Sequence, residues 1–112
     1  MDRTKKILAT SAGKSPTSIM KELLEVLTPS VIVPEVDKYY VFIYRAKTKG
    51  ITYDQHPLVV VTGIFRWGFT GWNMHAGPRR YTWGEVITNL YEVRDDELNT
   101  VGKLPIALFK QS

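Results

Sequence analysis

Apolar residues recur at helical spacing in the first quarter of the chain, at Ile19, Met20, Leu23, Leu24 and Leu27. Spacings of three and four residues put these side chains on one face, which predicts an amphipathic helix. Ser15 and Pro16 mark its start, because a serine oxygen accepts from free backbone N–H groups and proline needs no N–H in the first turn. Thr28 precedes Pro29 and is pushed out of helical geometry, so the helix should end there.

Two runs of aromatic and β-branched residues predict strands. Residues 39–44 (YYVFIY) are too few for a stable helix and should form a central strand. Residues 58–65 (LVVVTGIF) predict a second strand, and residues 47–50 supply a turn between the two.

Glycines punctuate the segment that follows. Gly68 and Gly71 favour a hairpin whose second strand begins near Phe69. Residues 76–78 (AGP) should end that hairpin.

Thr82 and Glu85 have the spacing of a capping box, in which each side chain reaches the backbone N–H of the other residue. We therefore predict a short helix over residues 83–91 that packs on the sheet. Its apolar face is formed by Trp83, Val86, Ile87 and Leu90.

The two ends of the chain are harder to place in a core. Residues 1–14 have no clear period and are rich in small, polar and basic side chains, which predicts a flexible basic arm.

Residues 29–34 form a proline-bounded link, and residues 95–97 (DDE) an exposed acidic turn. Residues 104–109 (LPIALF) predict a last edge strand, with Pro105 limiting its pairing.

These elements predict an α+β fold: a small antiparallel sheet or partly closed barrel, two short helices, and extended N- and C-terminal arms. A length of 112 residues fits one small core, so we expect residues 15–112 to form a single globular domain. Apolar residues make up 44% of the chain and charged residues 23%, which excludes wholesale disorder.

Cysteine is absent, which excludes disulfides, thiolate zinc sites, iron–sulfur clusters and thiol nucleophiles. This composition suits a reducing cytoplasm. No apolar stretch approaches the roughly 18 residues of a membrane-spanning helix, and we expect no membrane partner.

The net charge of +4 is unevenly distributed. Residues 38–80 hold seven lysines and arginines against one acid, Asp54, whereas residues 15–37 and 81–112 are acidic. A basic centre between acidic segments can face a polyanion or the acidic patches of neighbouring subunits. It can also be an ordinary solvated surface.

Asp54, His56 and His75 are the one set that resembles a metal site, since two histidines and a carboxylate can bind zinc or iron. Their spacing does not encode such a site. The favoured interpretation is that Asp54 and His56 satisfy the backbone groups of a turn and that His75 closes a hairpin. Among the serines we see no nucleophile elbow or triad. We therefore predict no metal, no cofactor, no catalytic residue and no enzymatic activity.

The most informative surface candidates combine arginine with aromatic rings. We predict a partner-binding set of Arg66, Trp67, Phe69, Trp72, Arg79, Arg80 and Tyr81. The same composition suits protein hot spots, base stacking with phosphate contacts, or rings buried in a core. For nucleic acid, the predicted set is Arg45, Lys47, Lys49, Arg66, Arg79 and Arg80.

Residues 53–54 (YD), 56–59 (HPLV) and 71–75 (GWNMH) resemble a pattern in small uncharacterised proteins of tailed bacteriophages, especially contractile-tailed ones. Trp72 stands where that pattern has leucine. The resemblance implies a structural or assembly component of the virion, in the tail, baseplate or head–tail region. It brings no catalytic residues with it.

Two functional hypotheses follow. The first is a non-enzymatic virion adaptor that contacts other phage virion proteins in a symmetric assembly, and is found in the virion and, during assembly, in the host cytoplasm. The alternative is a small phage accessory protein that binds DNA or RNA through its basic aromatic face.

Overall fold

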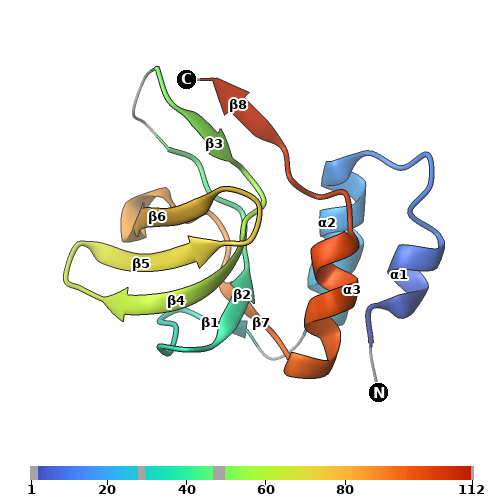
Figure 1. The fold of residues 1–112 in the computed structure, drawn as a ribbon, viewed down its shortest axis with the longest axis horizontal. Coiled ribbons are helices and arrows are strands. Elements are labelled where there is room, and N and C mark those ends of the chain that lie inside the picture. The colour runs from blue at the N-terminus through green and yellow to red at the C-terminus, as the bar shows by residue number, and fades with distance from the viewer. Residues whose placement is uncertain (1–2, 28–29, 47–49, 112) are drawn as a thin grey trace.

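The computed structural model of the protein describes residues 3–27, 30–46 and 50–111 (Figure 1). Its helices are α1 (Lys5–Ala9), α2 (Pro16–Val26) and α3 (Leu98–Lys103), with 3-10 turns η1 (Trp83–Glu85) and η2 (Asp95–Glu97). Its strands are β1 (Ser30–Val31), β2 (Tyr39–Val41), β3 (Thr52–Asp54), β4 (Leu58–Ile64), β5 (Gly68–Asn73), β6 (Gly77–Thr82), β7 (Leu90–Val93) and β8 (Phe109–Gln111). The predicted helix end at Thr28 and residues 47–49 of the predicted turn lie outside the described residues.

Six strands form one sheet in the order β1-β7-β2-β4-β5-β6, and β3 pairs with β8 in a second, two-stranded sheet. Each of these pairings is antiparallel. This confirms the α+β prediction and the central place of the strand that begins at Tyr39, although β2 ends at Val41 and not at Tyr44 as predicted. Over the described residues β1 and β6 remain the two edges, so the sheet is open and the alternative of a barrel is wrong.

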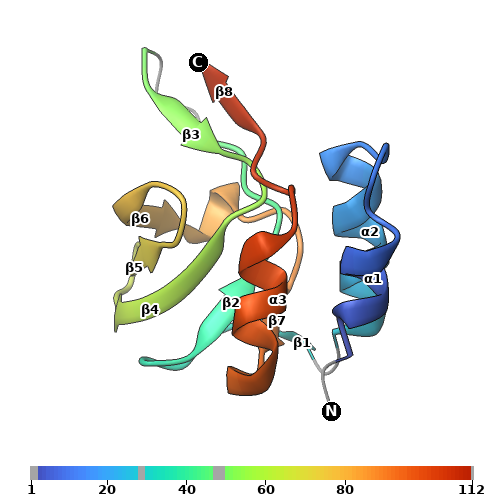
Figure 2. The same cartoon turned by 45° about the vertical axis from the view of Figure 1, so that its right-hand side comes forward.

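Helix α2 forms as its sequence predicts. The Ser15 side chain accepts a hydrogen bond from the Ser18 N–H at 3.1 Å, and Pro16 occupies the first turn. Ile19, Met20 and Leu23 are buried against the sheet. Figure 2 shows the three helices together on one side of the sheet, where their apolar faces form one core with Val41, Leu58 and Val93.

The N-terminal segment does not behave as the predicted arm. Residues 5–9 form α1, and Ile7 joins the core beneath the helices. Arg3 donates through Nε to the Glu97 carboxylate at 2.7 Å and through Nη2 at 3.1 Å. Two buried contacts that local periodicity cannot reveal, one apolar and one ionic, therefore attach this end of the chain to the domain.

The prediction of an exposed acidic turn at residues 95–97 is wrong for Glu97, whose side chain is fully buried. Burial by itself raises the pKa of the Glu97 carboxyl. Hydrogen bonds from the Arg3 side chain and the Arg94 backbone, together with the Arg3 charge, outweigh that effect and hold this pKa below its ordinary value.

The predicted helix over residues 83–91 is wrong. Only the turn η1 forms, and the Thr82 hydroxyl donates to the Glu85 carboxylate instead of accepting from its N–H. Val86 then bridges to Tyr44, and β7 fills the place between β1 and β2. A nine-residue helix is marginal alone, whereas a central strand satisfies its backbone on both sides.

The C-terminal strand begins later than predicted. Leu104 and Ile106 are buried in the core below the helices and belong to no strand. Strand β8 starts at Phe109 and pairs with β3. Strand β6 was not predicted either, because residues 77–78 look like a break. Gly77, at φ 82°, is nevertheless the first residue of this strand and pairs with Asn73.

Candidate functional site

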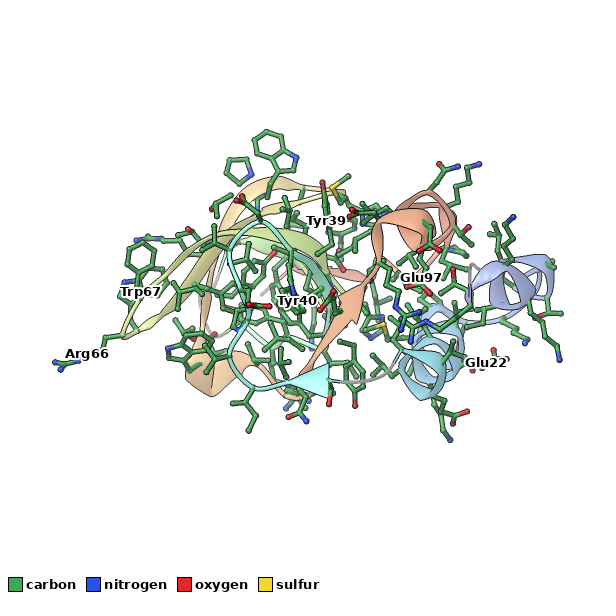
Figure 3. The ribbon with its side chains drawn as sticks, turned by 90° about the horizontal axis from the view of Figure 1, so that it is seen from below. Glu22, Tyr39, Tyr40, Arg66, Trp67 and Glu97 are labelled. Atoms are coloured by element: carbon green, nitrogen blue, oxygen red, sulfur yellow. The ribbon has the colours of Figure 1, made fainter. Side chains whose placement is uncertain are left out.

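Two exposed aromatic rings of the sheet, those of Phe65 and Trp67, lie at the β4–β5 turn. Phe65 and Gly68 close this turn with mutual backbone hydrogen bonds of 2.8 and 3.3 Å, which leaves Arg66 and Trp67 at its tip. The rings of Phe65 and Trp67 stack at a centroid distance of 5.3 Å and an angle of 3°. Arg66 points away from the molecule at this end (Figure 3).

Two contacts from the next segment of chain fix the turn. The Trp83 indole donates to the Phe65 carbonyl at 3.1 Å. The Arg80 guanidinium lies 5.9 Å from the centre of the Trp67 ring, within range of a cation–π interaction. The turn therefore presents its rings in a defined arrangement.

Strand alternation extends this surface along β5 and β6. Thr70 is paired with Arg80 and Trp72 with Pro78, so these side chains share one face of the sheet. Thr70 also lies beside the Phe65 ring, which covers Gly63. We call the surface formed by Phe65, Trp67, Thr70, Trp72 and Arg80 the aromatic–arginine face.

Phe69 and Tyr81 were predicted to bind a partner, but they point to the opposite side of the sheet and are buried there. Phe42 packs edge-to-face on both rings, at centroid distances of 5.6 and 5.2 Å. Burial also raises the pKa of the Tyr81 hydroxyl, which receives a hydrogen bond from Asn73. These two residues therefore stabilise the fold, and the prediction of their surface role is wrong.

Phe65 was missed as a site residue. In an unbroken strand it would share one side with Trp67 and Phe69. The turn at residues 66–67 interrupts the alternation, so the first two rings stay exposed while the third is buried. Gly68, four residues after the last aliphatic residue Ile64, predicted a hairpin here but did not show that Phe65 stays exposed.

A cavity of about 480 Å³ lies between β6 and β3, and its lining includes Trp67 and Arg80 of the aromatic–arginine face. Aromatic rings of Tyr44, Tyr53 and Tyr81 contribute to its wall. Its charged lining carries both signs, from Arg79 and Arg80 and from Asp54 and Glu85. Such a lining selects neither an anion nor a cation.

The structure brings together two of the three metal candidates. His75 Nδ1 lies 3.7 Å from Asp54 Oδ2, whereas His56 Nδ1 is 2.9 Å from the Ile106 carbonyl. Asp54 Oδ1 accepts from the backbone N–H groups of His56 and Leu108, which ties β3 to the C-terminal segment. Across the described ranges, no three His, Cys, Asp or Glu side chains gather into a group that could hold a metal ion.

The candidate nucleic-acid residues do not form one stripe. Neighbouring Arg79 and Arg80 leave β6 on opposite faces, so that Arg79 opposes Gly71 while Arg80 reaches Trp67. The Arg45 backbone donates to the Glu85 carbonyl, which places an acid close by. Lys47 and Lys49 lie outside the described residues.

Comparison with known proteins finds no family model, no curated protein and no solved structure that matches this chain. Within residues 3–27, 30–46 and 50–111, none of the helices has the length and apolar character needed to cross a membrane.

Proposed function

We propose that this protein acts without catalysis, as an adaptor that binds another protein through its aromatic–arginine face. One observation carries the proposal: three large, well exposed aromatic side chains and an arginine share one face of a sheet whose helices cover a different area. Tryptophan and arginine are the residue types that dominate binding energy at protein interfaces.

The electrostatics of the face support the same conclusion. Residues 55–84 contain three arginines and no acid. Within the described part of the chain, Arg66, Arg79 and Arg80 form no ion pair with a carboxylate. A partner that brings a carboxylate to this face would therefore form a new, partly desolvated pair without breaking an existing one.

The resemblance to small bacteriophage proteins suggests the setting, a virion or its assembly in the host cytoplasm. There the partners would be other virion proteins arranged with symmetry. A binding face that is already ordered suits such repeated contacts, because little side-chain freedom is lost on docking.

Particle incorporation tests this proposal. We expect a Phe65→Ala, Trp67→Ala double variant to copurify with virions at roughly one tenth of the wild-type level or less, because two anchor rings are lost. Phe109→Ala is the matched control, since Phe65 is 47% and Phe109 48% exposed. Absence of the wild-type chain from purified particles, by mass spectrometry, would overturn the proposal.

The nucleic-acid alternative has one observation in its favour, the Arg80–Trp67 contact, which could hold a phosphate beside a stacked base. Three phosphate contacts predict a log–log salt slope of about −3 on duplex DNA. Binding with that slope, lost in an Arg66→Ala, Arg79→Ala, Arg80→Ala variant, would replace the adaptor proposal with this one.

A further inference from the structure

An exposed loop next to β4, on the side of that strand away from β5, carries apolar side chains that are not buried in the core. Residues 32–37 (IVPEVD) leave Ile32 76%, Val33 59% and Val36 45% exposed. Contiguous exposed apolar residues often mark an interaction surface, whereas single exposed apolar residues are common on any protein. We call residues 32–37 the acidic loop, because Glu35 and Asp37 flank Val36.

This loop is held in one conformation. The Glu35 N–H donates to the Tyr40 hydroxyl at 2.9 Å, and the Asp37 N–H donates to the Val61 carbonyl at 2.8 Å. Pro34 is buried beneath them. Asp37 adopts a left-handed backbone with φ 70°, a conformation that aspartate tolerates better than most residues. A loop fixed in this way loses little freedom when it binds.

Its charge complements the aromatic–arginine face. Glu35 pairs with Lys38 at 2.6 Å, but the Asp37 carboxylate forms no ion pair with any described residue. Arg80, on the other surface, likewise has no carboxylate partner there. Each surface thus combines apolar side chains with one uncompensated charge, and the two charges are of opposite sign.

Asp37 of the loop and Arg80 of the face do not lie side by side within one molecule. The loop is hydrogen-bonded to β4 at Val61, on the side of that strand facing away from β5, and β6 lies beyond β5. Two strands therefore separate the acidic loop from Arg80. We therefore consider the pairing of these two charges between two molecules.

We propose that the acidic loop of one copy docks on the aromatic–arginine face of a second copy of this chain. Val36 would cover the Phe65–Trp67 stack, and Asp37 would pair with Arg80. This inference rests on the proposed function, because it assigns one partner to the same face.

Sedimentation velocity of the full chain tests the inference over a concentration series at low and high salt. We expect self-association that weakens with salt, because the pair is partly exposed. Val36→Lys with Asp37→Asn, and separately Arg80→Glu, should each weaken association roughly tenfold or more. Lys103→Glu, an exposed charge reversal on α3, should leave it unchanged.

Mixing the two variants gives the sharpest result. The loop variant keeps a native face and the Arg80→Glu variant keeps a native loop, so a mixture should form a complex that neither forms alone. Asp37→Asn and Arg80→Gln replace any variant that circular dichroism shows to be unfolded. Asparagine keeps the tolerance for a left-handed backbone.

Two outcomes would overturn the inference: a wild-type chain that stays monomeric at the highest concentration and low salt, or association that survives both variants. In either case the adaptor proposal is judged separately by particle incorporation. If Phe65→Ala, Trp67→Ala still abolishes incorporation, the face binds a different virion protein and only the homotypic contact is rejected.

Discussion

Two groups of aromatic rings lie on opposite faces of the same sheet. On the inner face, Phe42 contacts Tyr44, Phe69 and Tyr81 with ring planes between 72° and 88° apart, and all four rings are buried. On the outer face, Phe65 and Trp67 stack almost parallel and remain about half exposed. Both groups consist of aromatic residues, phenylalanine and tyrosine on the inner face and phenylalanine and tryptophan on the outer face.

The difference shows that aromatic content does not by itself identify a binding surface. Edge-to-face contacts in the inner group satisfy each ring within the fold, so a partner has nothing to gain there. The outer rings keep an open face that a partner can remove from water, and Arg80 beside them supplies a charge. Substitutions in the two groups should therefore change different measured quantities.

The largest expected effect on stability is in the inner group. Phe42→Ala should lower the free energy of unfolding by about 4 kcal/mol, because it leaves a cavity among closely packed rings. Phe65→Ala should lower it by less than about 1 kcal/mol, as expected for a half-exposed ring. Urea denaturation of both variants checks the contrast. Equal losses would mean that the outer stack is part of the core.

A second contrast concerns arginines. Arg3→Ala should destabilise the fold by about 3 kcal/mol, because it leaves the buried Glu97 carboxylate without its cation. Arg66→Ala, at the tip of the β4–β5 turn, should change stability by less than about 0.5 kcal/mol. Thermal unfolding provides the measurement. An Arg3→Ala variant as stable as the wild type would show that the N-terminal segment does not hold α3.

The smallest expected effect is the contribution of Glu97 to the pH dependence of the free energy of unfolding. Its pKa is lowered in the folded state, so its contribution to stability is complete above the carboxyl's ordinary pKa and is lost as the pH falls through the lowered value. Urea midpoints should therefore fall less steeply below about pH 4.5 in Glu97→Gln than in the wild type. Parallel pH profiles would contradict the assignment. Exposed Glu22, paired with Lys14, provides the control as Glu22→Gln.

Signals confined to a few neighbouring residues were sufficient for part of the fold. Ser15 and Pro16 predicted the start of α2, and Gly68 predicted a hairpin because a tight turn needs a small residue where backbones approach closely. A Cβ on Gly68 would lie only 1.9 Å from the Tyr81 carbonyl oxygen. Such requirements depend on nearby residues and can be recognised in the sequence.

Three features could not be recognised in the sequence: the attachment of residues 3–9 to the domain, the strand at residues 90–93 and the pairing of β8 with β3. Each depends on contacts between residues distant in sequence, such as Arg3 with Glu97 and Leu90 with Val31. Residues 83–91 match a helix pattern locally. A strand at residues 90–93 is nevertheless more stable than that helix, because it pairs with both β1 and β2. The helical preference of single residues contributes less free energy than several backbone hydrogen bonds and a buried side chain.

The sequence by itself therefore determined the α+β class, the cap of α2, the central strand and a region rich in arginine and aromatic residues. Only the tertiary structure decided which of those rings are exposed and which ones stabilise the fold. The reason is that one turn at residues 66–67 resets the alternation of the strands: it leaves Phe65 and Trp67 in solvent and places Phe69 in the core.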